Sequence, residues 1–204
     1  MYCDTCIHIP HVNMELKQRV FIFGHSFVHR FQSFLQSDVK YINLGLCQSR
    51  FSVKCYGLVG LKLNQSHRLH SADNVIAGAD LVILDIGLCE QDFSPDRFVL
   101  NLISYANYLL HGLDVKKVVI VQLLYRDKVP FASYNDVVIN TNIILERTIN
   151  ANNSPILFWK HRGMWKPPVP ILDNDGVHLS KEIGYPKYLR SMRDCVIRVS
   201  RWFA

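Results

Sequence analysis

The stretch Gly24-His25-Ser26 places a hydroxyl side chain directly after an apolar run, Arg19 to Phe23. A glycine there lets the chain turn sharply, and Ser26 then begins a spacing of apolar residues that is typical of a helix. Backbone N–H groups at the start of a helix point outward and favour negative charge. Two interpretations follow. Either Ser26 caps the helix, or Ser26 is a nucleophile and the N–H groups at the helix start stabilise the negative charge that its attack creates.

A nucleophilic serine needs a base to accept its proton and a carboxylate to orient that base. The stretch Asp175-Gly176-Val177-His178 supplies an imidazole and a carboxylate within one turn, and Gly176 permits the bend. Taken alone, it fits a capping aspartate beside a surface histidine equally well. Ser26 and the Asp175 block both follow apolar segments, and ligands of parallel sheets bind where the strands end.

In combination these motifs resemble the SGNH hydrolases, also called the GDSL esterase family. That family has a Gly-Asp-Ser block after the first strand and an Asp-x-x-His block before the last helix; here they read "FGHSF" and "DGVHLS". The resemblance covers about residues 18 to 203, and the stretches "QLLYR" and "YNDVVINTNIIL" are further points of similarity. It implies a flavodoxin-like α/β/α fold, with Ser26 as nucleophile, His178 as general base and acid, and Asp175 as its orienting partner. His25 departs from the family's aspartate, which is not a member of the triad.

The resemblance also implies an oxyanion hole, to which the backbone N–H of Ser26 contributes. The family's second block supplies a glycine N–H, for which Gly60 is the candidate and Gly57 the alternative. The third block, Gly-x-Asn-Asp, is altered here to "IGLCEQD". Direct alignment places Cys89 at the asparagine position, whereas a two-residue insertion places Gln91 there. A thiol is a poor donor and a glutamine amide a good one, so the two alignments predict different activity.

The elements that must position these residues alternate between apolar strands and amphipathic helices. Such alternation predicts βαβ units in a mostly parallel, three-layer α/β/α fold with five strands. Ser52 to Gly60 is interpreted as a short extended piece that ends in the flexible segment Gly57-Leu-Val-Gly60. The predicted strands are Arg19–Phe23, Lys40–Leu44, Asp80–Ile86, Lys117–Leu124 and Pro155–Trp159. Three predicted helices begin near residues 26, 94 and 134, and a fourth occupies about residues 181–203.

Length and composition indicate one domain, residues 18–204, after an N-terminal tail of residues 1–17. The 204 residues are 49% hydrophobic and 20% charged, which is an ordinary globular composition. We see no signal peptide and no apolar run of about 20 residues, so we expect an intracellular, cytoplasmic protein with free thiols. The clustered "CDTCIHIPH" is not expected to bind zinc, and no metal or organic cofactor is expected.

Three functions remain open from the sequence. The first is a serine esterase that cleaves a small ester through an acyl-enzyme, with Arg126 as a candidate substrate contact or a strand cap. The second is a binding module that keeps the fold but has lost activity, which the altered third block favours. The third is an association with nucleic acid, because esterase domains resembling this one occur in proteins of mobile elements and the basic last helix would fit a tethered role.

Overall fold

A five-stranded parallel sheet forms the centre of the computed structural model, which describes residues 17–88, 94–151, 154–164 and 170–201. The strand order is β2-β1-β3-β4-β5, the order of flavodoxin-like folds, so the expected fold class is confirmed. The strands are β1 (Gln18–Gly24), β2 (Phe51–Gly57), β3 (Leu81–Asp85), β4 (Val118–Val121) and β5 (Ile156–Trp159). β3 and β4 are completely buried, as expected for central parallel strands.

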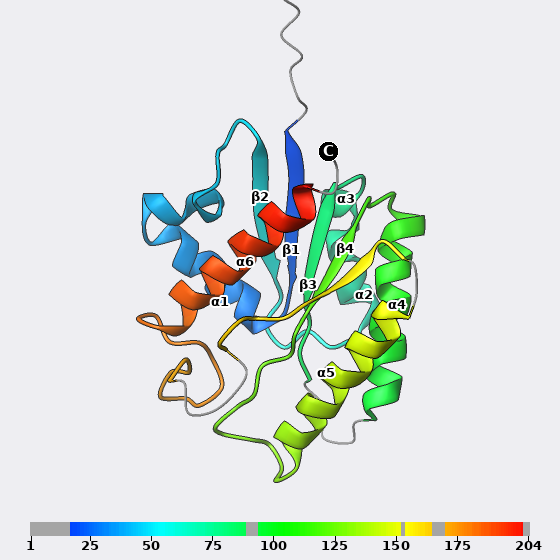
Figure 1. Cartoon of the computed structure of the whole chain (residues 1–204), viewed down its shortest axis with the longest axis vertical. Coiled ribbons are helices and arrows are strands. Elements are labelled where there is room, and N and C mark those ends of the chain that lie inside the picture. Colours follow the sequence, from blue (N-terminus) through cyan, green and yellow to red (C-terminus); the bar gives the residue numbers. More distant parts are fainter. Residues whose placement is uncertain (1–16, 89–93, 152–153, 165–169, 202–204) are drawn as a thin grey trace, which may run out of the picture.

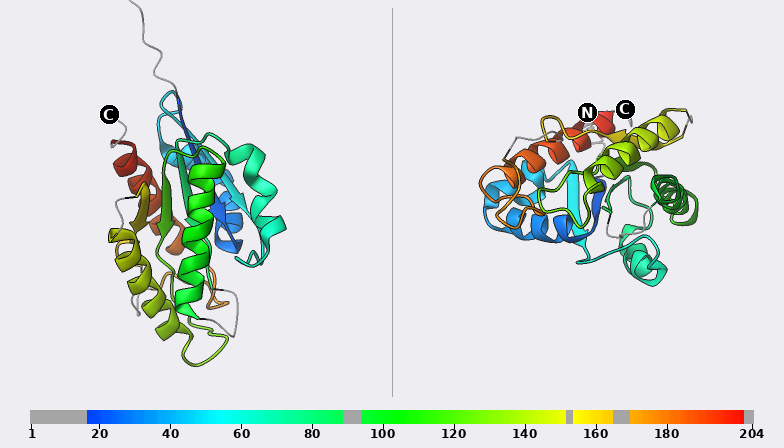
Figure 2. Two further views of the ribbon diagram at one scale, coloured as in Figure 1. Left: turned by 90° about the vertical axis from the view of Figure 1, so that its right-hand side faces the viewer. Right: turned by 90° about the horizontal axis from the view of Figure 1, so that it is seen from below.

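Helices cover both faces of this sheet (Figures 1 and 2). One face packs against α1 (Ser26–Gln36), η1 (Val39–Gly45) and α6 (Gly184–Ser200). The other packs against α2 (Ser66–Leu69), η2 (His70–Ala72), α3 (Asp73–Ile76), α4 (Pro95–Gly112) and α5 (Tyr134–Asn150). Within the described residues, no helix is both long enough and apolar enough to cross a bilayer.

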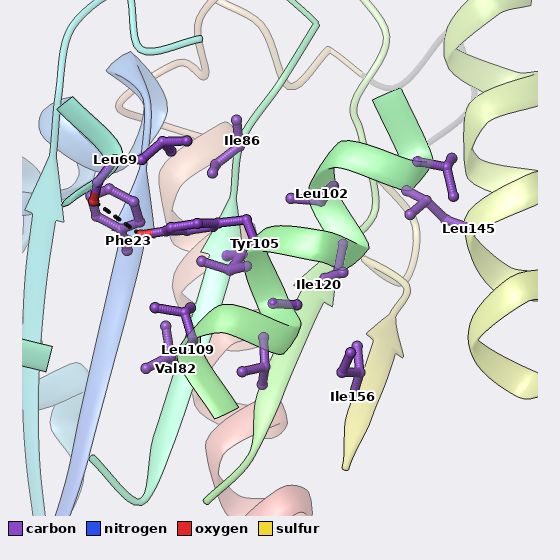
Figure 3. Close-up of a cluster of buried hydrophobic side chains, with 14 of the residues drawn as sticks. Phe23, Leu69, Val82, Ile86, Leu102, Tyr105, Leu109, Ile120, Leu145 and Ile156 are labelled. Atoms are coloured by element: carbon purple, nitrogen blue, oxygen red, sulfur yellow. Dashed lines mark hydrogen bonds between the residues drawn. The ribbon is translucent and has the colours of Figure 1, made fainter. Parts of the chain in front are cut away.

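Two apolar clusters hold the layers together, one on each side of the sheet. Figure 3 shows the cluster on the α4 side, where Leu102, Tyr105 and Leu109 of α4 lie against Phe23 and Val82 of the sheet. The Tyr105 hydroxyl donates to the Leu69 carbonyl over 3.0 Å, so its polar end is satisfied inside the cluster. Packing of this kind fixes the carboxyl ends of β1, β3 and β4 relative to one another.

The prediction of a strand at Lys40–Leu44 is wrong, because these residues lie in the 3₁₀ helix η1. Asp38 caps the Lys40 N–H, and Asn43 and Leu44 both adopt left-handed backbone angles that no strand allows. The Asn43 side chain then holds the connection, since it donates to the Phe51 carbonyl and accepts from the Val53 N–H. The fifth strand is β2, Phe51–Gly57, which overlaps the segment predicted to be extended, residues 52–60. Of the expected N-terminal tail, residues 1–16 lie outside the described part of the chain.

Candidate active site

Ser26 is the first residue of α1 and follows β1 directly, as the sequence predicted. The turn is tight because Gly24 lies against β3: a Cβ on Gly24 would be 2.0 Å from the Asp85 carbonyl oxygen. The His25 N–H donates to that same carbonyl over 3.1 Å. Close contact with β3 therefore fixes the direction in which α1 begins and the position of the Ser26 side chain.

His178 lies opposite Ser26 across the carboxyl edge of the sheet. Ser26 Oγ and His178 Nε2 are 3.0 Å apart, although 152 residues separate them in the chain. On the far side of the ring, His178 Nδ1 is 2.7 Å from Asp175 Oδ2. If Nδ1–H donates to the carboxylate, Nε2 is free to accept the Ser26 proton. His178 is thus within hydrogen-bonding distance of both Ser26 and Asp175, in the order that a nucleophile, a base and an orienting acid require.

The Asp175 carboxylate is fixed by its own loop. Its Oδ1 accepts from the N–H groups of Val177 over 2.9 Å and His178 over 2.8 Å. Partial desolvation acts to raise the pKa of Asp175, but these two backbone bonds and the His178 ring outweigh it and hold the pKa well below its usual range. Gly176 makes the turn with φ of +65°, and its carbonyl accepts from the Asp127 and Lys128 N–H groups. The loop therefore presents an ionised carboxylate to His178.

His25 stands where the family's motif has an aspartate, and it is the N-cap residue of α1. Its Nδ1 accepts from the Phe27 N–H over 3.2 Å, which caps α1. Burial, with smaller effects from Arg126 and His178, lowers the pKa of His25 to about 3, so the ring is neutral. Its Nε2 lies 3.7 Å from Asp85 Oδ1 and would be 2.5 Å from a Cβ on Gly87. His25 thus occupies the space that a glycine at position 87 provides.

Only some of the residues predicted to form the oxyanion hole are among the described residues. Gly60 lies in the loop after β2 with φ of +67°, and β2 is the direct neighbour of β1. Gly57 instead packs on α1, where a Cβ would be 2.0 Å from the His29 nitrogen, so close helix packing explains that glycine. Cys89 and Gln91 lie outside the described residues, and the choice between them stays a prediction.

Arg126 holds the chain just before Cys89. Its Nη2 donates to the Leu88 carbonyl over 3.3 Å, and the guanidinium lies over the Tyr134 ring, 4.9 Å from its centre. The Tyr134 hydroxyl donates to the same carbonyl over 3.2 Å. These contacts give Arg126 a positioning role at the third block; contact with a substrate stays a prediction.

A buried carboxylate behind the site was not predicted from the sequence. Asp85, at the end of β3, is buried and accepts a short hydrogen bond from the Tyr188 hydroxyl of α6. Burial raises the pKa of Asp85, which the Tyr188 bond partly opposes. An acidic residue at the end of the apolar run "LVILD" was the available signal, but its partner lies 103 residues away. No group of three or more histidine, cysteine and acidic residues suited to a metal occurs in the described part of the chain.

The structure resembles several solved hydrolases. A GDSL-like lipase from Bacteroides thetaiotaomicron matches over 89% of this chain and 88% of its own, with a TM-score of 0.66 and 18% identity. A lipase/acylhydrolase from Enterococcus faecalis matches over 90% and 96%, with a TM-score of 0.63 and 15% identity. An acetyl xylan esterase matches over 87% and 99%, with a TM-score of 0.63 and 18% identity.

Comparison of sequences alone finds no counterpart: no protein-family model matches this chain, and no curated protein matches it. The likeness is therefore one of three-dimensional structure, spread over nearly the whole chain. With the strand order and the two helical layers, it shows that this protein has the three-layer α/β/α fold of the SGNH, or GDSL, hydrolases.

Proposed function

We propose that this protein is a serine esterase that cleaves a small ester through an acyl-enzyme intermediate. The single observation that carries the proposal is the continuous chain of hydrogen-bonding contacts from Ser26 Oγ through His178 to Asp175, with distances of 3.0 and 2.7 Å. A fold shared with lipases and esterases raises the expectation of hydrolysis, but the fold alone does not define a reaction.

In the first half of the reaction, His178 Nε2 takes the proton of Ser26 Oγ as that oxygen attacks the ester carbonyl carbon. The imidazolium that forms is stabilised by Asp175, whose low pKa keeps it ionised. His178 then gives the proton to the leaving alcohol, and the acyl group remains on Ser26. In the second half, His178 activates a water molecule, which releases the acid and restores the Ser26 hydroxyl.

The tetrahedral intermediate needs donors for its oxyanion. The first N–H groups of a helix have no acceptor within that helix, and His25 already takes the Phe27 N–H. We therefore assign the Ser26 N–H to the oxyanion, together with the Gly60 N–H and a donor from Cys89 or Gln91. Loss of one such donor costs about 10² to 10³ in rate, so a thiol at this position predicts a slow enzyme and an amide a faster one.

The test is hydrolysis of p-nitrophenyl acetate by the wild type and by Ser26→Ala, His178→Ala and Asp175→Asn. We expect each variant to lose about 10³-fold or more of kcat/KM. Ser37→Ala is the matched control, because Ser37 is an exposed serine at the other end of α1, and it should retain full activity. Equal turnover by wild type and Ser26→Ala would contradict the proposal and favour a binding module instead.

A further inference from the structure

A groove of about 1150 Å³ runs along the free edge of the sheet, between α5 and α6. Figure 1 shows β5 between these two helices, and among the described residues no further strand lies beside it. Neither Ser26 nor the other two members of the proposed triad lines this groove. It is therefore a second surface feature, separate from the candidate active site.

The floor of the groove is the edge of β5, which offers backbone hydrogen-bonding groups. The Pro155 carbonyl accepts from the Val118 N–H of β4 and the Trp159 carbonyl from the N–H of Gln122, just after β4, and backbone groups alternate in direction along a strand. The N–H and C=O of Phe158 and the C=O of Ile156 therefore point to the free edge, while the Ile156 N–H is bonded to Ser154 Oγ. Edges of this kind accept an additional strand.

The two walls differ in chemistry. On the α5 side, Ile139 and Ile143 line the groove with 41% and 40% of their surface exposed. On the α6 side, Lys187, Arg190 and Arg198 line it. The side chains of β5 already alternate between these environments, since Phe158 packs in the cluster that contains α5 and Trp159 packs in the cluster that contains α6.

The groove is also strongly basic. Five lysine and arginine side chains and two acidic side chains line it, a net charge of +3 out of +6 for the whole chain. Lys160 and Glu146 form an ion pair with each other over 2.7 Å. Apart from that pair, the groove lining holds one carboxylate, Asp194, and four positively charged side chains. These are Arg162, Lys187, Arg190 and Arg198. An occupant of this groove must supply negative charge.

We propose that the groove binds an extended peptide segment whose side chains alternate between acidic and apolar residues, added as a sixth strand to the edge of β5. Successive side chains of such a strand point to opposite faces of the sheet. One set would then meet the lysine and arginine side chains of α6, and the other would meet Ile139 and Ile143 of α5. The peptide backbone would bond to Phe158. A single-stranded nucleic acid has the charge, but it has neither the backbone N–H donors nor the alternating apolar face.

The experiment measures binding of a fluorescent peptide of alternating valine and glutamate at neutral pH, by fluorescence anisotropy with the full chain. We expect saturable binding that weakens with salt. A shuffled peptide, with the valines and glutamates in two separate blocks, should bind about tenfold more weakly. Lys187→Glu/Arg190→Glu should weaken binding of the alternating peptide about tenfold as well. The matched control is Arg193→Glu, which lies on α6 but points to η1 beside Gly45 and should bind like the wild type.

Two backbone-methylated peptides test the strand addition itself. One carries N-methyl groups on every valine and the other on every glutamate, so each blocks a different edge of the peptide strand. We expect one of them to lose binding and the other to keep it. Three results would overturn the proposal: both methylated peptides bind, the shuffled peptide binds as tightly as the alternating one, or an oligothymidylate binds this groove when the peptide does not.

Discussion

Two aspartates near Ser26 have opposite electrostatic environments. Asp175 is held ionised by backbone N–H groups and the His178 ring, whereas burial raises the pKa of Asp85. Arg30 adds a longer contact of 3.4 Å to the same Asp175 oxygen that faces His178, and its exposure makes that contact weak. The Asp175 carboxylate suits the stabilisation of a cationic ring, and Asp85 suits the anchoring of α6 through Tyr188.

Tyr188→Phe tests that anchoring role. The substitution keeps the ring in the core but leaves the buried Asp85 carboxyl without its donor, so we expect a loss of about 1–3 kcal/mol in the free energy of unfolding. The double variant Tyr188→Phe/Asp85→Leu removes both polar partners and should recover much of this loss. Urea unfolding followed by circular dichroism measures both. A double variant no more stable than the single one would show that the pair does not act together.

Site residues could be predicted from the sequence where they form short motifs, but not where a residue and its partner lie far apart in the chain. Asp175 and His178 are three residues apart, and Ser26 follows a recognisable strand, so both stretches could be matched to motifs of the SGNH hydrolases, and that resemblance pointed to them. Tyr188 could not be predicted, because its helical spacing equally fits a purely apolar core residue. Its hydroxyl meets Asp85 only when β3 and α6 pack together.

At the scale of elements, the turn from β1 into α1 depends on two glycines. A Cβ on Gly24 would lie 2.0 Å from the Asp85 carbonyl oxygen, and one on Gly57 would lie 2.0 Å from the His29 nitrogen. Both contacts involve backbone atoms, which cannot move aside without shifting a strand or α1. The position of Ser26 therefore depends on the close approach of β1, β2, β3 and α1.

A pair of glycine substitutions separates close packing from backbone conformation. Gly57→Ala should cost about 3 kcal/mol or more, because the added methyl group forces α1 away from β2. Gly60→Ala should cost only about 1 kcal/mol, since its φ is +67° but no atom lies within 4 Å of the new Cβ. Midpoints of urea unfolding give both values. The packing explanation fails if the two substitutions cost the same.

Helix and strand patterns in the sequence predicted most elements, but not the connection between α1 and β2. The residues Tyr41, Ile42 and Leu44 have the composition of a strand, yet Asp38 and Asn43 bond to the nearby backbone and fold them into η1. Short polar side chains compete with regular structure in this way. The edge groove was equally out of reach, since it exists only where α5, α6 and β5 meet.

At the scale of the whole molecule, buried histidines make stability depend on pH. Burial lowers the pKa of His25 to about 3 and that of His161 to about 4, from ordinary values of 6.5. Between those values and 6.5 the unfolded chain binds protons that the folded chain does not, so stability is complete above pH 6.5 and falls as the pH falls. Asp85 acts in the opposite direction, because its raised pKa lets the folded chain bind a proton at a higher pH than the unfolded chain does.

We expect the free energy of unfolding to fall by a few kcal/mol between pH 7 and pH 5, with about 2 kcal/mol from each of the two histidines at pH 5. His25→Asn, which keeps an acceptor for capping α1, should show a shallower dependence on pH, whatever its stability at pH 7. Urea unfolding at several pH values measures the slope. Identical slopes in the wild type and the variant would rule out the contribution of His25.

Locating the reactive side chain tests the proposed esterase mechanism directly. The wild-type protein is incubated with a fluorophosphonate and digested, and the modified peptide is identified by mass spectrometry. We expect a single phosphonylated residue, Ser26, with the modification lost in Ser26→Ala and strongly slowed in His178→Ala. An unmodified protein, or a modification at another residue that persists in Ser26→Ala, would contradict it.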